Sequence, residues 1–204
     1  PRFTASSGLR KGRGHVGSAA GRDIAGVTRL SYTGIPDFRL GVSGYAGNTA
    51  HGRMERGALV LLGEADAKYS LAGFDIEGIG SVIRIPDAGA INNANGFTGT
   101  ASVGQTILGG YGELAYHLLN LAPVETEQDL ILFGRYEWYD TQFRVPTGFA
   151  ADGDNRRKNI WLGLNYRPVN NFVFKFEYQW NETKNELLEQ GDNNGFVTSV
   201  AMGF

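Results

Sequence analysis

Apolar and polar side chains alternate most clearly between residues 159 and 181. From 159 to 167, the apolar set is Ile160, Leu162, Leu164 and Tyr166, and the alternating set is Trp161, Gly163, Asn165 and Arg167. After residues 168–171 the pattern resumes, with Phe172, Phe174, Phe176, Tyr178 and Trp180 opposing Val173, Lys175, Glu177, Gln179 and Asn181. A period of two predicts strands with one apolar and one polar face. Residues 195–204 continue in the same phase, with Phe196, Thr198, Val200, Met202 and Phe204 on the apolar face.

The same period recurs earlier in the chain. It predicts strands over residues 23–33, 38–45, 59–69, 74–82, 108–118 and 130–139, which makes nine strands in all. Their connections alternate in length. Short or medium connections lie at 34–37, 70–73, 120–129 and 168–171, and long polar ones at 47–56, 86–105, 140–158 and 182–194. Residues 1–22 are polar, basic and without periodicity, so we expect a polar loop or a disordered start there.

This organisation predicts an all-β fold, an antiparallel transmembrane β-barrel of the outer-membrane porin type. Such barrels have brief periplasmic turns and long external loops, whereas a soluble sandwich has no reason to sort its loops by length. A periplasmic carboxyl terminus places every short turn on the periplasmic side and the amino end outside the cell. Bacterial single-chain barrels have an even number of strands. Nine strands therefore suggest the carboxyl-terminal half of a larger barrel, with its preceding strands missing.

Composition narrows the class further. The chain is 42% hydrophobic and 20% charged, and no stretch approaches the run of about 18 apolar residues that a spanning helix needs. Alternating strands keep hydropathy low, so insertion as a barrel remains open. The absence of cysteine excludes a disulfide scaffold and thiolate chemistry, and a net charge of −2 argues against nucleic acid as a partner.

Three segments resemble a known family. They are IPDFRLGVSGYAG at 35–47, LILFGRYEWYDTQ at 130–142 and LGLNYRPVNNFVFKFEYQWN at 162–181. They are similar to the carboxyl-terminal half of the phosphate-selective porin O and P family, in order and spacing, from about residue 30 onward. The resemblance implies a trimeric channel for small solutes in the outer membrane of a Gram-negative bacterium, with about sixteen strands when complete. Phosphate selectivity in that family uses a basic ladder, and this chain departs from it.

Charged residues recur on the polar faces of the predicted strands. Because Arg or Lys on a lipid-facing surface costs about 2–4 kcal/mol at the membrane midplane, these faces should line the pore. The predicted pore-lining residues are Arg29, Arg39, Glu64, Asp66, Lys68, Asp75, Glu77, Glu113, Arg135, Glu137, Arg167, Lys175 and Glu177. Six bases nearly cancel seven acids. The set is either a lattice of cross-strand ion pairs that stiffens the wall or a charged track that sets solute preference, and one residue can do both.

The basic residues suggest a more specific arrangement. Arg135, Arg167 and Lys175 come from consecutive strands and could form a short basic track opposite Glu113, Glu137 and Glu177. Arg156, Arg157 and Lys158 lie in a predicted loop that could fold inward. Both features would favour anions.

Aromatic residues gather near the predicted membrane boundaries. Those expected at the periplasmic rim are Tyr32, Phe38, Tyr69, Phe74, Tyr116, Tyr166 and Phe172, and those at the outer rim are Trp138 and Trp180. They are typical of interfacial girdles, the alternative being a soluble aromatic core.

Catalytic and metal-binding chemistry finds little support. Only His117 among the histidines lies on a strand, where a polar rim residue is expected. Residues 152–155 lack the later ligands of a calcium loop and are expected to form an acidic external loop. We therefore predict no enzyme and no cofactor.

The predicted function is passive diffusion of small hydrophilic solutes, phosphate-like anions included, across the bacterial outer membrane. Outer-membrane lipid is the expected partner, and a homotrimer the expected assembly. A non-conducting barrel that serves as a receptor, a structural protein or an enzyme is the alternative. Small and charged inward residues such as Ser43 and Ser81 favour a water-filled lumen, whereas Tyr45, Phe133 and Trp161 favour a partly filled one. A soluble ligand-binding sandwich is a third possibility, and it would fold without detergent.

Overall fold

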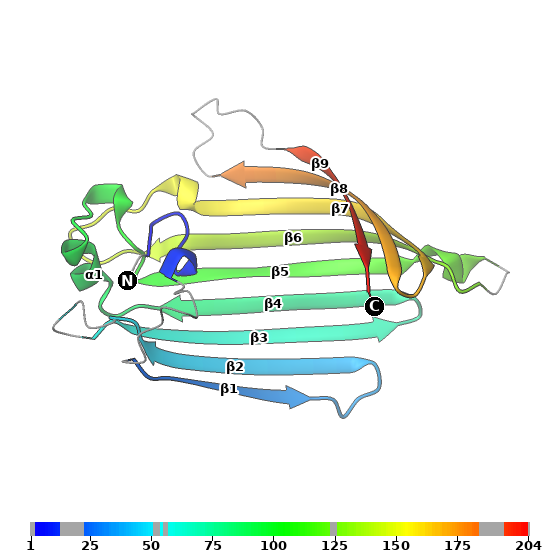
Figure 1. The fold of residues 1–204 in the computed structure, drawn as a ribbon, viewed down its shortest axis with the longest axis horizontal. Helices are drawn as coiled ribbons and strands as arrows, with labels where there is room; N and C mark the ends of the chain where they lie inside the picture. The colour runs from blue at the N-terminus through cyan, green and yellow to red at the C-terminus, as the bar shows by residue number, and fades with distance from the viewer. Residues whose placement is uncertain are drawn as a thin grey trace.

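The structure is a computed structural model that describes residues 3–12, 23–50, 54, 57–122, 126–183 and 194–203. Within these ranges the chain forms one antiparallel sheet of nine strands arranged in chain order (Figure 1). The strands are β1 (Ala25–Tyr32), β2 (Phe38–Asn48), β3 (Leu59–Leu71), β4 (Phe74–Arg84), β5 (Thr106–His117), β6 (Asp129–Arg144), β7 (Arg156–Val169), β8 (Phe172–Thr183) and β9 (Gly195–Met202). The nine strands predicted from the alternation of side chains are confirmed.

The sheet is open at both edges. In the described part of the chain, β1 pairs with β2 alone and β9 pairs with β8 alone. The expectation that these residues do not close into a barrel by themselves is therefore confirmed. Figure 1 shows β8 and β9 curving away from the direction of β2 to β6, as the twist of a large sheet requires.

Connections of different length lie at opposite ends of the sheet (Figure 1). At the short-turn end, residues 33–37, 72–73 and 170–171 join strands, but the connection 118–128 at that end is as long as 145–155 at the other. At the long-loop end, residues 49–58, 85–105, 145–155 and 184–194 join the strands. The turn between β3 and β4 needs only two residues, because Ala72 and Gly73 both have positive φ (51° and 83°). Paired positive φ angles match the twist of the flanking strands.

Several boundaries differ from the sequence expectation. β6 continues to Arg144, and β7 already begins at Arg156, so Arg156, Arg157 and Lys158 belong to a strand. The prediction that these three lie in an inward-folding loop is wrong. The predicted long loop over 86–105 contains α1 (Ala88–Ala94) and the short 3-10 helix η3 (Gly99–Ala101), and Leu118 starts another, η4 (Leu118–Leu121), instead of ending β5. Two further 3-10 turns are η1 (Arg10–Gly12) and η5 (Gly153–Asn155).

The two faces of the sheet carry different side chains. Directly opposed residues such as Leu30, Val42 and Ala65 lie on what we call the apolar face. Arg39, Lys68 and Glu77 are directly opposed on the other, the charged face. The pairing register keeps the predicted apolar positions of neighbouring strands together, because a slip of one residue would move every side chain of a strand to the other face.

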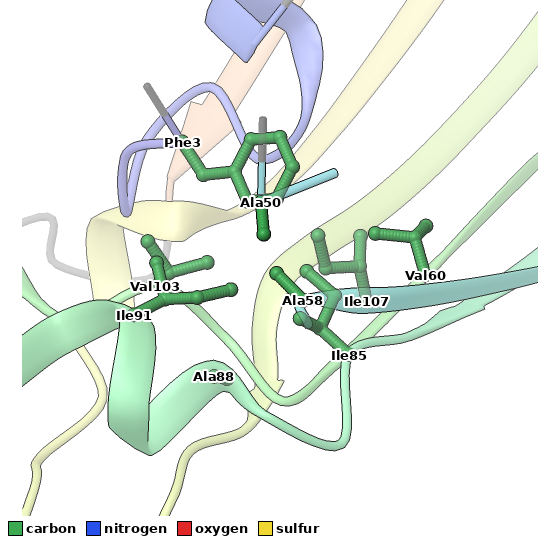
Figure 2. Close-up of a cluster of buried hydrophobic side chains, with 9 residues drawn as sticks. All are labelled: Phe3, Ala50, Ala58, Val60, Ile85, Ala88, Ile91, Val103 and Ile107. Atoms are coloured by element: carbon green, nitrogen blue, oxygen red, sulfur yellow. The ribbon is translucent and has the colours of Figure 1, made fainter. Parts of the chain in front are cut away.

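The main hydrophobic core lies at the long-loop end (Figure 2). Its buried residues are Phe3, Ala50, Ala58, Val60, Ile85, Ala88, Ile91, Val103 and Ile107. Val60 and Ile107 project from β3 and β5 with the alternation of the charged face, so the amino-terminal segment 3–12 and α1 pack over one end of that face. Of the stretch 1–22, residues 3–12 thus form a packed loop, while 13–22 lie outside the described residues. No helix in the described ranges is long and apolar enough to cross a membrane.

Candidate functional site

The apolar face stays exposed along the whole sheet. Leu30, Val42, Leu61, Ile76, Leu114, Leu132, Leu162, Phe176 and Phe196, one from each strand, expose 37–77% of their surface. A sheet in a soluble protein buries such a face against another layer. Nine strands about 4.8 Å apart, with an apolar band about 20 Å tall, make a surface on the order of 800 Å². The largest apolar patch of a typical soluble monomer covers only about 300–600 Å².

Aromatic rings border this face at both ends. Towards the short-turn end, Phe38 pairs with Tyr69 at 6.1 Å between ring centroids, and Phe74 pairs with Tyr116 at 4.4 Å. Further along the same end, Phe174 contacts both Tyr166 and Phe172. Towards the long-loop end, Tyr178 stacks edge-on against Trp180 at 4.4 Å. Several rings predicted at the two rims thus make contacts with each other, and aliphatic side chains share their rows: Ile76 is directly opposite Tyr69, and Leu162 is directly opposite Tyr178.

All of the predicted pore-lining residues lie on the charged face, as the strand register requires. One transverse row consists of directly opposed residues from five neighbouring strands: Arg39, Lys68, Glu77, Glu113 and Arg135. The order of charge along this row is two bases, two acids and one base. Most of these side chains form ion pairs, which fall into three groups.

The first group centres on Arg29 of β1. Its guanidinium contacts Asp66 at 2.7 Å and Glu64 at 3.6 Å on β3, and it donates a hydrogen bond to Ser43. The pair with Asp66 spans the intervening strand β2 directly above Gly41. A Cβ atom at Gly41 would lie 2.1 Å from Arg29 Nη2 and 2.4 Å from Asp66 Oδ2. Glycine at this position therefore leaves room for an ion pair across three strands.

The second group centres on Arg135 of β6. It contacts Glu113 at 2.6 Å, reaches Glu77 at 4.0 Å and lies over the ring of Tyr111, 4.6 Å from its centroid. Tyr111 in turn donates a hydrogen bond to Glu77. Two residues further along β6, Glu137 accepts a hydrogen bond from Asn159 of β7.

The third group lies at the short-turn end and centres on His117. Its Nδ1 is 2.8 Å from Asp129, and its Nε2 is 3.6 Å from Asp75. Lys68 contacts Asp75 at 3.7 Å, and Arg167 lies 4.0 Å from Asp129. The predicted rim residue His117 thus links two carboxylates on different strands.

The predicted basic track is not formed. Arg135 turns toward Glu113 and Glu77, and so away from β7 and β8. Lys175 is opposite Asn165, four residues along the strand from the level of Arg135. Arg167 approaches Asp129. Within the described residues, Lys175 and Glu177 take part in no ion pair of 4.0 Å or less, so they stand apart from the three groups.

Part of the charged face is apolar. Ala115, Ile131 and Phe133 are buried there, with Trp161 packed against them. The ring of Phe133 lies across Gly163, where a Cβ atom would come within 2.4 Å of it. This cluster covers the face between the second and third charged groups.

Polar anchors hold the loops over the long-loop end. Asn92 of α1 accepts a hydrogen bond from Val103 N at 2.7 Å and donates one to Val103 O. Gln142 of β6, 2% exposed, donates to carbonyl oxygens of Thr100 and Ser102 and accepts from Asp152 N and Asn155. These bonds join residues 100–102 and 152–155 to the sheet. In the predicted acidic loop, Asp152 accepts a hydrogen bond from Asp154 N, as in a cap.

Sequence reasoning missed some members of the charged groups. Asp129 falls in a predicted connection, and Tyr111 and Ser43 are polar-face residues without charge. The available signal for all three was the alternation itself, because each lies in phase with a charged neighbour on its strand. Asp129 pairs with Arg167 in the strand register, which no single-strand pattern shows.

Comparisons with known proteins give no family for the chain. No family model matches it. No solved structure matches it. An uncharacterized protein of Aquifex aeolicus (strain VF5) is 25% identical over 207 residues, which cover 99% of this chain and 46% of that protein. The chain thus spans about half the length of this curated relative. Its resemblance to phosphate-selective porins stays a prediction.

Proposed function

We propose that these nine strands form part of the wall of an outer-membrane β-barrel, with the apolar face against lipid and the charged face toward a water-filled lumen. The whole protein is then a porin that lets small hydrophilic solutes cross the bacterial outer membrane passively, with a homotrimer as its assembly. The observation that carries the proposal is the apolar face, exposed on every strand and carrying pairs of aromatic rings. Lipid is the environment in which such a surface is stable.

The dimensions of the sheet support this assignment. Most strands have 11 or more residues, enough to span a bilayer at a tilt of about 45°. Three of the four connections at one end have five residues or fewer, and all four at the other have ten or more, which also matches barrels with brief periplasmic turns and long external loops.

The open edges imply further strands in the complete barrel. A barrel leaves no edge unpaired, because unsatisfied backbone groups are costly in lipid. The relative has about 450 residues, since 207 residues are 46% of its length. If the rest of that protein has the same strand density as the nine strands here, the full wall has about 20 strands, within the range of bacterial outer-membrane barrels. Strands outside this chain would then pair with β1 and β9.

The charged face supports a weakly selective channel better than a phosphate-selective one. Its bases are largely neutralised by carboxylates, as in the pairs of Arg29 with Asp66 and of Arg135 with Glu113. A selective anion pathway needs unpaired positive charge along the lumen. Anion preference, if the whole channel has one, must then come from residues outside this half of the wall.

Single-channel recording on the full-length protein tests the proposal. Purified from outer membranes in detergent and reconstituted into planar bilayers, it should give discrete steps in KCl whose size grows with salt concentration. A protein that binds bilayers and folds in them without any conductance would contradict the porin assignment. A chain that folds in buffer without detergent or lipid would contradict the membrane assignment as well.

A non-conducting barrel is the second candidate, favoured by the packing at the long-loop end. Phe3, Ile91 and Val103 bury one end of the charged face under loops, and Phe133 covers part of its middle. Such filling would narrow or close the lumen if the missing wall carried similar loops. The same recordings separate the two candidates.

A further inference from the structure

The charged face has a groove of about 240 Å³ between β1 and β5, bordered by Arg29, Arg39, Lys68, Glu64, Asp66 and Glu77. We infer that this groove is a weak binding subsite for zwitterionic solutes of the amino-acid class, on the path through the proposed lumen. The inference rests on the proposed function and adds the class of solute. Three bases and three acids border the groove, so its charge is balanced but unevenly placed.

The basic side of the groove lacks close partners. Arg39 and Lys68 are directly opposite each other on β2 and β3, an arrangement that repulsion between like charges destabilises. Arg39 reaches a carboxylate only at 3.9 Å, on Asp66, and Lys68 only at 3.7 Å, on Asp75. Their side chains are 58% and 41% exposed. A carboxylate placed between them would relieve the repulsion and form two charge-assisted hydrogen bonds.

The acidic side of the groove consists of Glu77 on β4 and Glu64 on β3. Glu77 is directly opposite Lys68, but among the described residues its ion pair within 4.0 Å is with Arg135. Arg135 is held closer to Glu113, at 2.6 Å, and Tyr111 donates one hydrogen bond to Glu77, so the Glu77 carboxylate can still accept hydrogen bonds from a ligand. Glu64, on the long-loop side of the groove, is 3.6 Å from Arg29. An ammonium group can therefore donate hydrogen bonds to Glu77 or, further along the groove, to Glu64.

This arrangement favours a zwitterion over a simple ion. A dianion attracted to Arg39 and Lys68 would also face Glu64 and Glu77, and a cation attracted to Glu77 would face Lys68. A molecule with a carboxylate at one end and an ammonium at the other meets opposite charge at both ends. The volume equals about eight liquid waters of about 30 Å³ each, which suits a small amino acid. Partial exposure keeps the binding weak, as passage requires.

The test uses three probes of nearly equal size on the full-length channel. L-alanine carries both charges, sodium L-lactate lacks the ammonium group, and L-alaninol hydrochloride lacks the carboxylate. In constant KCl at pH 7, L-alanine should reduce single-channel current in a saturable manner. Its half-blocking concentration should be at least about fivefold lower than that of lactate or alaninol, because each of these loses one charged contact.

Variants locate the site of block. Arg39→Gln and Glu77→Gln should each raise the half-blocking concentration of L-alanine about tenfold. Lys175→Gln and Glu177→Gln are the matched controls, because they remove charges on the same face but outside the groove, and they should leave the block nearly unchanged.

Three results would overturn the inference. Equal block by lactate and L-alanine, with Glu77→Gln silent, would mean a simple anion site. Ordinary KCl conductance without saturable alanine block would reject the zwitterion subsite while leaving the porin assignment intact. Absence of KCl conductance would reject the proposed function, and the subsite with it.

Discussion

The two faces of this sheet carry side chains that favour opposite environments. On the apolar face, Leu30, Ile76 and Leu162 expose half or more of their surface. On the charged face, Arg29 and Arg135 are tied to carboxylates on neighbouring strands. In water the apolar face is unfavourable, while in lipid the charged face is unfavourable. The proposed environment, with lipid on one side and water on the other, would suit both.

The ion pairs of the charged face also connect strands that are not neighbours, and we expect the sheet to be stiffest there. Ion pairs of the charged face join strands that are not adjacent in sequence: Arg29 reaches from β1 to β3, and Arg135 from β6 toward β4. The apolar face has aromatic contacts, such as Phe38 with Tyr69 and Tyr178 with Trp180, together with aliphatic side chains. We therefore expect substitutions on the apolar face to affect insertion, and those on the charged face to affect local stability and ion passage.

Arginine substitutions should show the largest difference between the apolar face and the charged face. Leu132→Arg, Leu164→Arg and Phe174→Arg place a charge on the apolar face. They should make folding into a bilayer less favourable by about 2–4 kcal/mol near the midplane. Phe133→Arg, Asn165→Arg and Val173→Arg, one residue away on the other face, should be milder. Denaturant titration of folding into vesicles measures the difference. Equal effects in the two sets would show that the faces are wrongly assigned.

Removing the central cation of the second group should have the next largest effect. Arg135→Met leaves Glu77 and Glu113 directly opposite each other without the cation that lies between them. Because these side chains are partly exposed, we expect a loss of about 1–2 kcal/mol in unfolding free energy. Lys175→Met, a cation without an ion pair in the described residues, is the control and should change it by less than about 0.5 kcal/mol. If both variants lose equal stability, the pairing contributes nothing specific.

The three-strand ion pair above Gly41 can be tested by adding one methyl group. Gly41→Ala should displace the Arg29 guanidinium from Asp66 and cost about 1 kcal/mol or less, the range of a partly exposed pair. Gly44→Ala is the control on the same strand, since its Cβ would meet only Thr28 Cγ2, at 3.6 Å. A double-mutant cycle with Asp66→Asn checks the mechanism. Additive losses would mean that the methyl group acts elsewhere.

The smallest expected effect concerns ion preference. Neutralising Arg135 and Lys175 together in the full-length channel should shift the reversal potential toward cations, because Glu77, Glu113 and Glu177 then act without those bases. Raising the salt to about 1 M, where the screening length is about 3 Å, should reduce the shift. An unchanged reversal potential at low salt would mean that both bases only brace the wall.

The strands were predictable because their signal is local. From Ile160 to Tyr166, for example, the period of two in the sequence shows on which face each side chain lies. Neighbouring strands then keep register because their apolar positions match. The same logic placed every predicted charged residue on one face. Turn residues such as Pro36 and Asp37 marked where the strands end.

The tertiary features were harder to infer, since they depend on contacts between distant segments. α1 has only seven residues in a stretch rich in Asn and Gly, and it is stabilised by Ile91 packing and by Asn92 bonded to Val103. The burial of Phe3 depends on the same packed end of the sheet. The direction of Arg135 depends on two glutamates from other strands, so an alternation pattern that gives its face cannot give its partner.

The central claim is that lipid covers one face of the sheet and water the other, and spin labelling of β7 tests it most directly. The chain has no cysteine. Once any cysteine elsewhere in the full-length protein is replaced by serine, single cysteines at 160 to 166 can each be labelled in the protein folded in vesicles. Accessibility to oxygen, which partitions into lipid, should peak at 160, 162, 164 and 166. Accessibility to a water-soluble nickel complex should peak at 161, 163 and 165. Loss of this period of two, or high nickel accessibility at 162 and 164, would contradict the account.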